Sequence, residues 1–566
     1  MSTQQHQLAA SHIFTIPLAD LAAFATYATI ADAYPLTTET VGIMDEQRVI
    51  YLDTADYRLL RTGLAVCVEQ DHEQRLLTVA NLAVGLTGDV DKQISRRKPL
   101  TATIGSDEVA TTIKAWPKAL RKAVAPVLSS HAKLHPILLI QRQRTVRTIT
   151  ASPNSKSALA ALPLATLTLD HLTVWPPTQE ALHDRTPAAA HPITTLGQLT
   201  ITFISDAVLD DEVTEATMPD TTAAAQATIT TWLANQPGYV AVASGHQLLL
   251  PAALTAASHH ALDGLDETGI QPQMSIVDGC RLIWREQLMT MILQEAGVRY
   301  SQEREYVHEM RIAIRRARAA AKLYGHFWPR KTIRPYLAAL RKTGRLLGYI
   351  RNLDVALTKA RRTRDQHGEK VRAPKKLLKA WRQQRQAAQQ KLLHWLDSSD
   401  YNDFVAEFQH FCTAAEVQSQ SQRTMPTPQQ VRHVIPAQIW TGYASVRCYE
   451  ALFEAALPVD YAALHNLRIA CKYLRYNLEF VRHLLGAESE PLITRLKGLQ
   501  ELLGDLNDAV VAQTLIDEAR EEHEIAPYKE AQAQRMAELS RQVPAALAAL
   551  VDPESRSQLA IALARL

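Results

Sequence analysis

Basic side chains recur at helical spacing in a segment near the middle of the chain. His308, Arg311, Arg315, Arg318 and Lys322 are separated by 3, 4, 3 and 4 positions. At about 100° per residue, these side chains fall within an arc of roughly 80° on one side of a helix. Neighbouring cations on one helix face repel each other by about a few tenths of a kcal/mol per pair. A group outside the helix is therefore expected to compensate this charge.

The stripe recurs later in the chain together with the sequence around it. Residues 307–318, VHEMRIAIRRAR, reappear as residues 464–475, LHNLRIACKYLR, at a shift of 157 positions. Downstream, residues 346–352, LLGYIRN, are matched at a shift of 156 positions by residues 502–508, LLGDLND. A unit of roughly 150 residues thus occurs twice, which predicts two similar helical bundles related by a pseudo-twofold axis.

The second copy carries its own cations, and further ones follow the first stripe. In the second copy, the cations at positions that correspond to the first stripe are His465, Arg468, Lys472 and Arg475. Arg482 lies close by in sequence, and the acid Glu479 stands where the first copy has Lys322. The segment after the first stripe adds Arg341 and Arg345 at helical spacing, and Arg351 follows the Leu-Leu-Gly sequence, which is interpreted as a turn.

The composition of these stripes favours a phosphate chain as the partner. Residues 301–400 contain 25 basic and 8 acidic residues, so acids on neighbouring helices are too few to neutralise them. Arginine forms paired, charge-assisted hydrogen bonds with phosphate oxygens, and lysine adds point charge. The alternative is a set of solvated helix faces, which is the expectation for the less patterned stretch 361–385. A metal site at His308 is not expected, because no carboxylate, His or Cys is seen at ligand spacing on that face and the arginines repel a cation.

The two halves of the chain differ in charge and in pattern. Residues 1–270 carry a net charge of −8, and residues 271–566 carry +11. The first 205 residues contain runs typical of strands, such as 12–16, 47–52, 64–68 and 136–150. After Pro272 the pattern changes to long amphipathic segments, which predict a helical bundle. The expected fold class is α+β multidomain, with an antiparallel β-rich N-terminal half and an all-α C-terminal half.

At this point the C-terminal half resembles the two halves of a CHAD domain, the conserved histidine α-helical domain. The motifs are VHEMRIAIRRARAA with LLGYIRNLDVAL, and LHNLRIACKYLRYNLEF with LLGDLNDAVVA. The resemblance implies a pair of four-helix bundles that bind inorganic polyphosphate, often on polyphosphate granules. By position, the implied ligand contacts are His308, Arg311, Arg315, Arg316, Arg318, Arg341 and Arg345, then His465, Arg468, Lys472 and Arg475. Asn352 departs from the family, which commonly has Asp there.

Parts of residues 10–205 look like a CYTH domain, the triphosphate tunnel fold, in the order YLDTAD, LLRTGL and LLTV. Such an enzyme needs inward carboxylates for Mg²⁺ or Mn²⁺ and cations for the triphosphate. The first strand reads HIFTI where the family has Glu-x-Glu-x-Lys, and Asp170 stands alone at a strand end. Arg142, Arg144 and Arg147 remain and could hold an anion weakly. We interpret this half as a degenerate, tunnel-like barrel that has lost hydrolysis.

The expected organisation is therefore a degenerate CYTH-like barrel at 1–205, its C-terminal elements and a linker at 206–271, and two CHAD repeats at 272–425 and 426–566. The predicted function is non-catalytic binding of polyphosphate, with no cofactor and no metal. Two alternatives stay open: a metal-dependent triphosphatase or polyphosphatase in the N-terminal half, and nucleic-acid binding. The latter is disfavoured because the stripes have little aromatic interleaving. No apolar run of 18 residues and no signal-like start are seen, so a cytoplasmic protein without a membrane span is expected.

Overall fold

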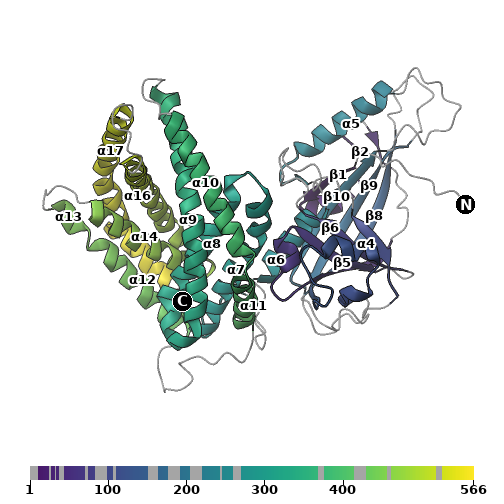
Figure 1. Cartoon of the computed structure of the whole chain (residues 1–566), viewed down its shortest axis with the longest axis horizontal. Coiled ribbons are helices and arrows are strands. Elements are labelled where there is room, and N and C mark those ends of the chain that lie inside the picture. The colour runs from purple at the N-terminus through teal and green to yellow at the C-terminus, as the bar shows by residue number, and fades with distance from the viewer. Residues whose placement is uncertain are drawn as a thin grey trace, which may run out of the picture. The chain divides into compact units, whose positions relative to one another are not determined.

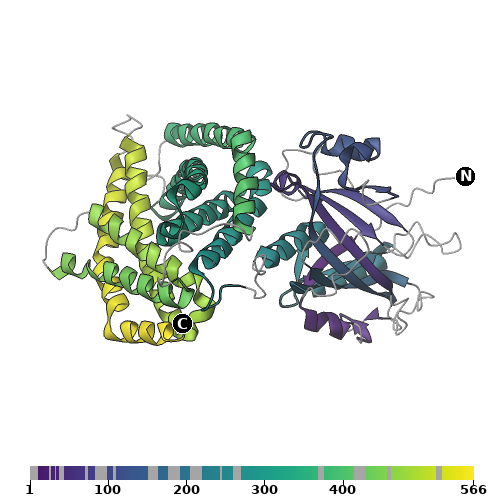
Figure 2. The same cartoon turned by 90° about the horizontal axis from the view of Figure 1, so that it is seen from below.

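The computed structural model describes residues 11–24, 27–31, 34–36, 44–70, 74–82, 99–105, 110–150, 163–175, 192–203, 219–242, 245–258, 269–367, 375–413, 429–454, 461–517 and 526–566. Two compact units form (Figures 1 and 2). The first comprises Met1–Ala257 with Tyr300–Gln302, and the second comprises Ser258–Arg299 with Glu303–Leu566. Parts of the region 206–271, expected to hold C-terminal elements and a linker, lie outside the described residues, at 206–218, 243–244 and 259–268.

The first unit is built on one antiparallel sheet, as predicted. Its strands lie in the order β11-β1-β10-β9-β8-β4-β5-β6-β7, and each described pair is antiparallel. Their bounds are β1 (Ser11–Ile16), β4 (Met44–Asp53), β5 (Leu64–Gln70), β6 (Arg75–Asn81), β7 (Leu100–Thr103), β8 (His135–Thr150), β9 (Pro163–Trp175), β10 (Thr194–Phe203) and β11 (Val240–Val242). A small separate sheet pairs β2 (Thr29–Ile30) with β3 (Tyr34–Pro35). The predicted strand segments therefore all fall within observed strands, give or take a residue at an end.

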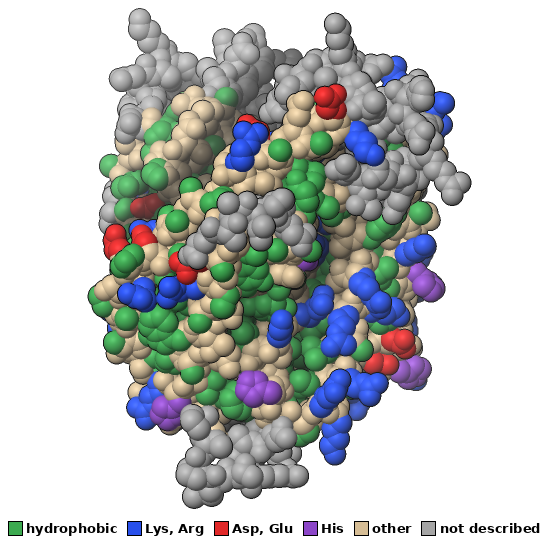
Figure 3. All heavy atoms as spheres, turned by 90° about the vertical axis from the view of Figure 1, so that its left-hand side faces the viewer, with side chains coloured by type: hydrophobic (Ala, Val, Ile, Leu, Met, Phe, Trp, Pro, Cys, Tyr) green, Lys and Arg blue, Asp and Glu red, His purple; other side chains and the backbone are tan. Residues whose placement is uncertain are grey.

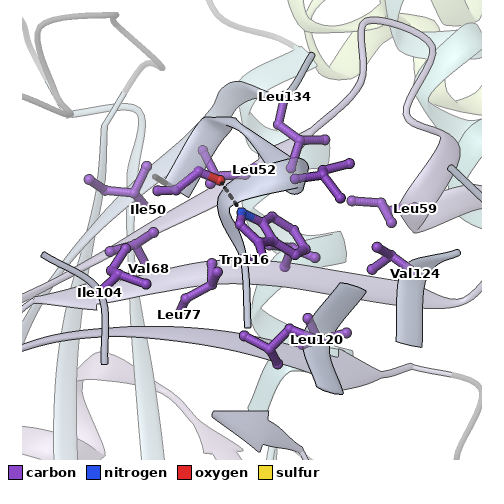
Figure 4. Close-up of a cluster of buried hydrophobic side chains, with 14 of the residues drawn as sticks. Ile50, Leu52, Leu59, Val68, Leu77, Ile104, Trp116, Leu120, Val124 and Leu134 are labelled. Carbon is purple, nitrogen blue, oxygen red and sulfur yellow. Dashed lines mark hydrogen bonds between the residues drawn. The ribbon is translucent and has the colours of Figure 1, made fainter. Parts of the chain in front are cut away.

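One face of the main sheet carries two hydrophobic clusters. The first gathers Ile50, Leu52, Val68 and Leu77 around Trp116, whose indole N–H donates to the Ala110 carbonyl at 3.0 Å (Figure 4). It is covered by α4 (Lys118–Val124), while α2 (Arg58–Arg61) supplies Leu59. The second lies over β1, β8, β9 and β10 and is covered by α1 (Leu18–Phe24) and α5 (Pro219–Ala234). α6 (Gly245–Ser258) completes the unit.

The opposite face of this sheet is buried as well. Strand alternation places Tyr51, Cys67, Ile140 and Asp170 there, and each is only 1% exposed. A sheet buried on both faces is compatible with the tunnel-like barrel predicted from the sequence. Among the described strands, however, β7 and β11 are the two ends of the sheet order, and no described pair joins them.

The second unit is all helical, which confirms the predicted fold class. Its first part contains α7 (Ile276–Tyr300), α8 (Arg304–Tyr324), α9 (Arg330–His367), α10 (Lys375–Leu396) and α11 (Ser399–Thr413). Its second part contains α12 (Val431–Arg447), α13 (Glu450–Glu454), α14 (Tyr461–Phe480), α15 (Arg482–Leu485), α16 (Glu490–Asp517), α17 (Ala526–Val551) and α18 (Pro553–Leu563). In Figure 1, α9 and α10 lie side by side, as do α16 and α17.

Different contacts hold the two parts of this unit. In the first part, Trp284, Trp328, Phe408 and Phe411 form a buried aromatic cluster with ring centroids 4.9–6.3 Å apart. In the second, α16 contacts both α14 and α17, and buried leucines of all three helices belong to its core. The repeated helices α8 and α14 contact each other, so the two copies of the motif meet where the two parts join.

One buried ion network stabilises the first part. The carboxylate of Asp354 on α9 is fully buried and lies 2.7 Å from Nε of Arg385 and 3.3 Å from Nε of Arg304. Arg304, Asp354 and Arg385 thereby connect α8, α9 and α10. Arg385 is therefore a packed structural residue, and its expected place in a solvated basic stretch was wrong.

The Leu-Leu-Gly sequences are not turns, contrary to the sequence interpretation. Residues 346–352 lie inside α9, and residues 502–508 lie inside α16. A Cβ at Gly348 would stand 3.7 Å from Nε of Arg311, an ordinary van der Waals distance, so this position of α9 lies beside the arginine of α8. Asn352, where the family commonly has Asp, is exposed on the same continuous helix.

Candidate functional site

Helix α8 presents its cations opposite a tightly packed apolar face. Val307, Met310, Ile314 and Ala317 are buried, each at 3% exposure or less. The predicted stripe lies on the other side, with Arg311 and Arg315 half-buried and Arg318 and Lys322 exposed. Packing of the apolar face fixes the rotation of the helix, so the period of 3.6 residues determines which way the arginines point.

Helix α14 brings the second stripe against the first. The Arg316 guanidinium of α8 lies 2.7 Å from a Glu479 carboxylate oxygen of α14. Arg315 and Arg316 also lie over the ring of Tyr476, at 5.7 and 5.6 Å from its centroid. Cation–π contacts of this kind hold charged groups without neutralising them. The two stripes thus converge at the junction of the two repeats.

A cavity of about 290 Å³ lies at this junction, and we call it the cationic pocket. Residues from both repeats line it: His308, Arg315, Arg468, Lys472, Arg475, Tyr476, Lys497, Gln500 and Glu501. On the face of the helical unit drawn in Figure 3, Lys and Arg side chains gather toward one side, with few acidic side chains among them. The pocket is therefore shared by α8, α14 and α16.

The pKa values of cations in and beside the pocket show how strongly these side chains are crowded. Burial, followed by repulsion from Arg315 and Arg468, lowers the pKa of Lys472 to about 8. Burial and the charges of Arg315, Arg468 and Arg351 lower the pKa of Arg311 to about 10. The pKa of Arg468 is lowered as well, by burial and then by Arg315. Each shift means that the protonated, charged form is disfavoured in the free protein.

Two cations of the junction already have a protein counter-ion. Glu479 accepts from Arg475 at 2.7 Å through one oxygen and from Arg316 at 2.7 Å through the other. Within the described parts of the chain, by contrast, no carboxylate lies within 4.0 Å of a charged nitrogen of Arg311, Arg315, Arg468 or Lys472. Nε of Arg315 is buried without a hydrogen-bond partner there, as is Nδ1 of His308. These groups are donors or charges that a bound anion would satisfy.

Arg351 and the exposed pair Arg318 and Lys322 belong to the same electrostatic cluster. Arg351 repels Arg311 and His308, and Arg318 and Lys322 repel Lys472. Lys322 and Lys472 both lie over the Tyr473 ring, at 4.3 and 4.7 Å from its centroid. The pKa of His308 is lowered by burial and then by Arg351, so near neutral pH this imidazole is an uncharged hydrogen-bonding group.

The remaining predicted residues are placed differently. Arg341 and Arg345 are exposed on α9, seven and three positions before Gly348, and helical geometry puts them on the side of α9 that faces Arg311. His465 is exposed, and its Nδ1 lies 3.0 Å from Oδ1 of Asn507. Arg482 does not belong to the site. α14 ends at Phe480, and Arg482 on α15 forms a two-pronged ion pair with Glu490 at 2.5 Å.

Sequence reasoning missed the contribution of α16 to the pocket. Lys497 and Gln500 line it, and the repeat contained the signal needed to find them. At the shift of 156 positions, Lys497 is the counterpart of Arg341, which was predicted. Applying the second shift to every predicted cation of the first repeat would have identified Lys497.

Two carboxylates lie near His308, although the sequence pattern had suggested none at ligand spacing. Glu305 and Glu309, three positions before and one position after His308, have carboxylate oxygens within 4.8 Å of a His308 ring nitrogen and of each other. Burial and the neighbouring Glu305 raise the pKa of Glu309. The charges of Arg311, Arg315 and Arg351 surround this group and oppose cation binding, as the sequence argument assumed.

In the first unit, the three arginines expected to hold an anion are already engaged. Asp170 lies within β9, not at a strand end, and accepts from Arg144 at 2.7 and 2.9 Å. Arg142 lies 3.9 Å from the same carboxylate. Arg147 points to the other face and donates to the backbone carbonyls of Phe24 and Tyr27 at 2.8 and 2.6 Å. The sequence expectation of a residual anion site at these arginines is therefore wrong for Arg144 and Arg147.

The fold and the site define a class: tandem helical repeats whose equivalent helices enclose a shared cationic pocket. Residues 282–517 match the family model of the CHAD domain, so the chain contains a CHAD domain in its helical unit. The crystal structure of the CHAD domain from the plant Ricinus communis is similar at 23% identity and a TM-score of 0.40, over 53% of this chain and 97% of that one. PptA from Streptomyces chartreusis is similar at 18% identity and a TM-score of 0.35, over 49% of this chain and 98% of that one.

No curated protein matches the chain in sequence. Among the described helices, none is both long enough and apolar enough to cross a membrane.

Proposed function

We propose that the helical unit binds inorganic polyphosphate in the cationic pocket and along the two basic stripes, without catalysing a reaction. One observation carries this proposal. Arg311, Arg315, Arg468 and Lys472 come from both repeats, are crowded and partly buried, and have no carboxylate at ion-pair distance within the described chain. Holding desolvated like charges together is costly, and a polyanion removes that cost.

A chain of phosphates fits this arrangement better than a single phosphate. The cations are spread along three helices, α8, α9 and α14, from Arg351 and Arg311 through Arg315 and Lys472 to Arg318 and Lys322. One rise of a helical turn, about 5.4 Å, separates successive members of each stripe. A linear anion with charge on every unit can contact several members at once. The match to the CHAD domain, a domain linked to polyphosphate binding, supports the same ligand.

The test is a titration of the full chain with long-chain polyphosphate, tripolyphosphate and single-stranded RNA at several salt concentrations. Polyphosphate is expected to bind most tightly, with affinity that falls steeply as salt rises, because counter-ions are released. RNA binding of equal affinity would favour the nucleic-acid alternative. Lack of binding by all three ligands would refute the proposal.

A charge-matched pair of variants separates the site from general electrostatics. Glu replacing Arg311, Arg315, Arg468 and Lys472 is expected to abolish binding, with helicity retained by circular dichroism. The control places Glu at four exposed basic residues of α10, which does not line the pocket: Lys375, Lys379, Arg382 and Lys391. Both variants change the net charge by the same amount. Equal loss in the two would show that binding depends on overall charge and not on the pocket.

The absence of catalysis is part of the proposal and has its own assay. The first unit would be the place for a triphosphatase, and its Arg144 is held by Asp170. We expect no release of phosphate from tripolyphosphate, ATP or polyphosphate with Mg²⁺ or Mn²⁺. Metal-dependent release that survives the four Glu substitutions would establish the enzyme alternative. In a cell, the proposal places the protein in the cytoplasm on polyphosphate granules, which co-localisation with stained granules would test.

A further inference from the structure

A second cavity, of about 380 Å³, lies beside α14 and α16, which also line the cationic pocket, and we call the two cavities together the α14–α16 groove. Both cavities are lined by α14 and α16. Arg468, Lys472 and Lys497 line the first, and the second begins one helical turn earlier on α14 with Leu464 and His465. The second cavity is mainly apolar. Its walls include Tyr461, Leu464, Leu503, Leu506 and Val510, and we call it the apolar pocket.

The equivalent place in the first repeat is filled by charged side chains. At the shifts of 157 and 156 positions, Tyr461, Asn507 and Val510 correspond to Arg304, Arg351 and Asp354. In the first repeat, Arg304 and Asp354 form the buried ion network with Arg385. The second repeat has replaced these ions with an aromatic ring, an amide and a valine, and a cavity is present instead. The two ends of the proposed phosphate path therefore differ in chemistry.

The apolar pocket offers what a nucleobase needs. Tyr461 is 42% exposed, so part of its side chain is accessible to a ligand that stacks on aromatic rings. Leu464, Leu503 and Leu506 form an apolar floor. Oδ1 of Asn507 lies 3.0 Å from Nδ1 of His465. The NH₂ group of Asn507 can still donate to a base edge or a sugar hydroxyl. Few polar groups on an apolar wall are typical of sites for small organic ligands.

The distance between the two pockets suits a base linked to phosphates. His465 and Lys472 are seven positions apart on α14, which is about 10 Å along the helix axis. A ribose and the first phosphates of a nucleotide span a path of this order. A bare polyphosphate chain has no group that would bury in the apolar pocket.

We propose that the α14–α16 groove binds a nucleoside polyphosphate, with the base in the apolar pocket and the phosphates in the cationic pocket. This inference rests on the proposed function, because it uses the same cations for the phosphates. The nucleoside would bind at one end of the line of cations, where the second repeat differs from the first. The other end, closed by Arg304 and Asp354, accepts phosphate alone.

The experiment compares ATP with tripolyphosphate on the full chain, by isothermal titration calorimetry in EDTA so that metal complexes do not differ. Both ligands carry three linked phosphates, so the comparison isolates the nucleoside. ATP is expected to bind about tenfold more tightly, which corresponds to about 1.4 kcal/mol. AMP, which has the base and one phosphate, is expected to bind more weakly than either.

Two variants with matched controls test the location. Ala462 is exposed and lines the apolar pocket, so Ala462→Trp fills the pocket without altering the core. This variant is expected to remove the preference for ATP and to leave the affinity for tripolyphosphate within about twofold. Ala444→Trp, at an exposed position on α12, is the control and should retain the preference. Tyr461→Ala should reduce ATP affinity alone, with Trp440→Ala, another exposed aromatic, as its control.

The outcomes separate this inference from the proposed function. Equal affinity of the wild-type chain for ATP and tripolyphosphate overturns the nucleoside inference, while tight binding of long polyphosphate would still stand. Loss of tripolyphosphate binding in Ala462→Trp also overturns it, because the two pockets would then not be separable. If neither ATP nor any phosphate chain binds, the proposed function fails as well.

Discussion

Lys472 provides a quantitative test of the electrostatic argument. Burial and the charges of Arg315 and Arg468 lower its pKa to about 8 in the free protein, from an ordinary value of 10.5. Phosphate oxygens placed beside the ammonium group favour its charged form and raise the pKa again. Binding near pH 8 must therefore be coupled to the uptake of a proton by Lys472.

The size of this coupling follows from the titration curve. At pH 8 about half of the Lys472 side chains are neutral, so each binding event takes up about half a proton; at pH 6 almost none are neutral and uptake by Lys472 vanishes. Between pH 7 and pH 9 the affinity is expected to fall about tenfold, if the pKa in the complex lies well above 9. The side chain is partly exposed, so screening reduces these values.

The stability of the free protein should change in the opposite direction over the same range. Lys472 has a folded pKa of about 8, and the unfolded chain, at 10.5, binds more protons between these values. The free energy of unfolding contributed by this group therefore rises as pH increases from about 8 to about 10.5. Weaker binding and higher stability with rising pH together identify a crowded cation as the cause.

The assay is calorimetry with long-chain polyphosphate in two buffers of different ionisation enthalpy at pH 8 and at constant salt. Lys472→Met should bind more weakly and without the associated proton uptake. Lys497→Met, which removes another lysine of the same pocket, should weaken binding but retain the uptake. Proton uptake that persists in Lys472→Met, or that is the same at pH 6 and pH 8, would refute the reasoning.

Three further predictions follow from particular contacts. Glu479→Gln should tighten polyphosphate binding by about threefold to tenfold, since Glu479 competes with phosphate for Arg316 and Arg475; an unchanged dissociation constant would show that this acid is not displaced. Arg482→Glu should leave affinity within about twofold, because Arg482 is paired with Glu490 outside the pocket, and filter binding would measure it. Asp354→Asn should lower the free energy of unfolding by about 3 kcal/mol in urea titrations, because it leaves Arg304 and Arg385 without their buried counter-ion; a loss below about 1 kcal/mol would contradict this role.

Much of the candidate site was predictable because it depends on local periodicity. Arg311 and Arg315, and their counterparts Arg468 and Lys472, lie on one helix face whenever their segments are helical. The duplication of this pattern predicted two equivalent helices, and the charge imbalance of residues 301–400 predicted an anionic partner. Strand alternation likewise predicted the segments of the antiparallel sheet.

Errors arose where a short motif has more than one structural meaning. Leu-Leu-Gly suggested a turn, yet Gly348 lies inside α9, which continues from Arg330 to His367. Arg482 appeared to continue the second stripe, but α14 ends at Phe480 and the arginine belongs to a different helix. Turns at glycines and the ends of helices are predicted from local propensity, and tertiary packing overrides that propensity.

The sequence alone determined the two basic helices, their repetition and the positive charge of the surface that they carry, because each follows from residues within a few turns of one another. Only the tertiary structure decided which cations share a pocket and which acids neutralise them. Arg316 and Glu479 are 163 residues apart, and Arg144 and Asp170 lie on neighbouring strands. Such pairs depend on how distant segments pack, and hydrophobic burial elsewhere in the fold sets that packing.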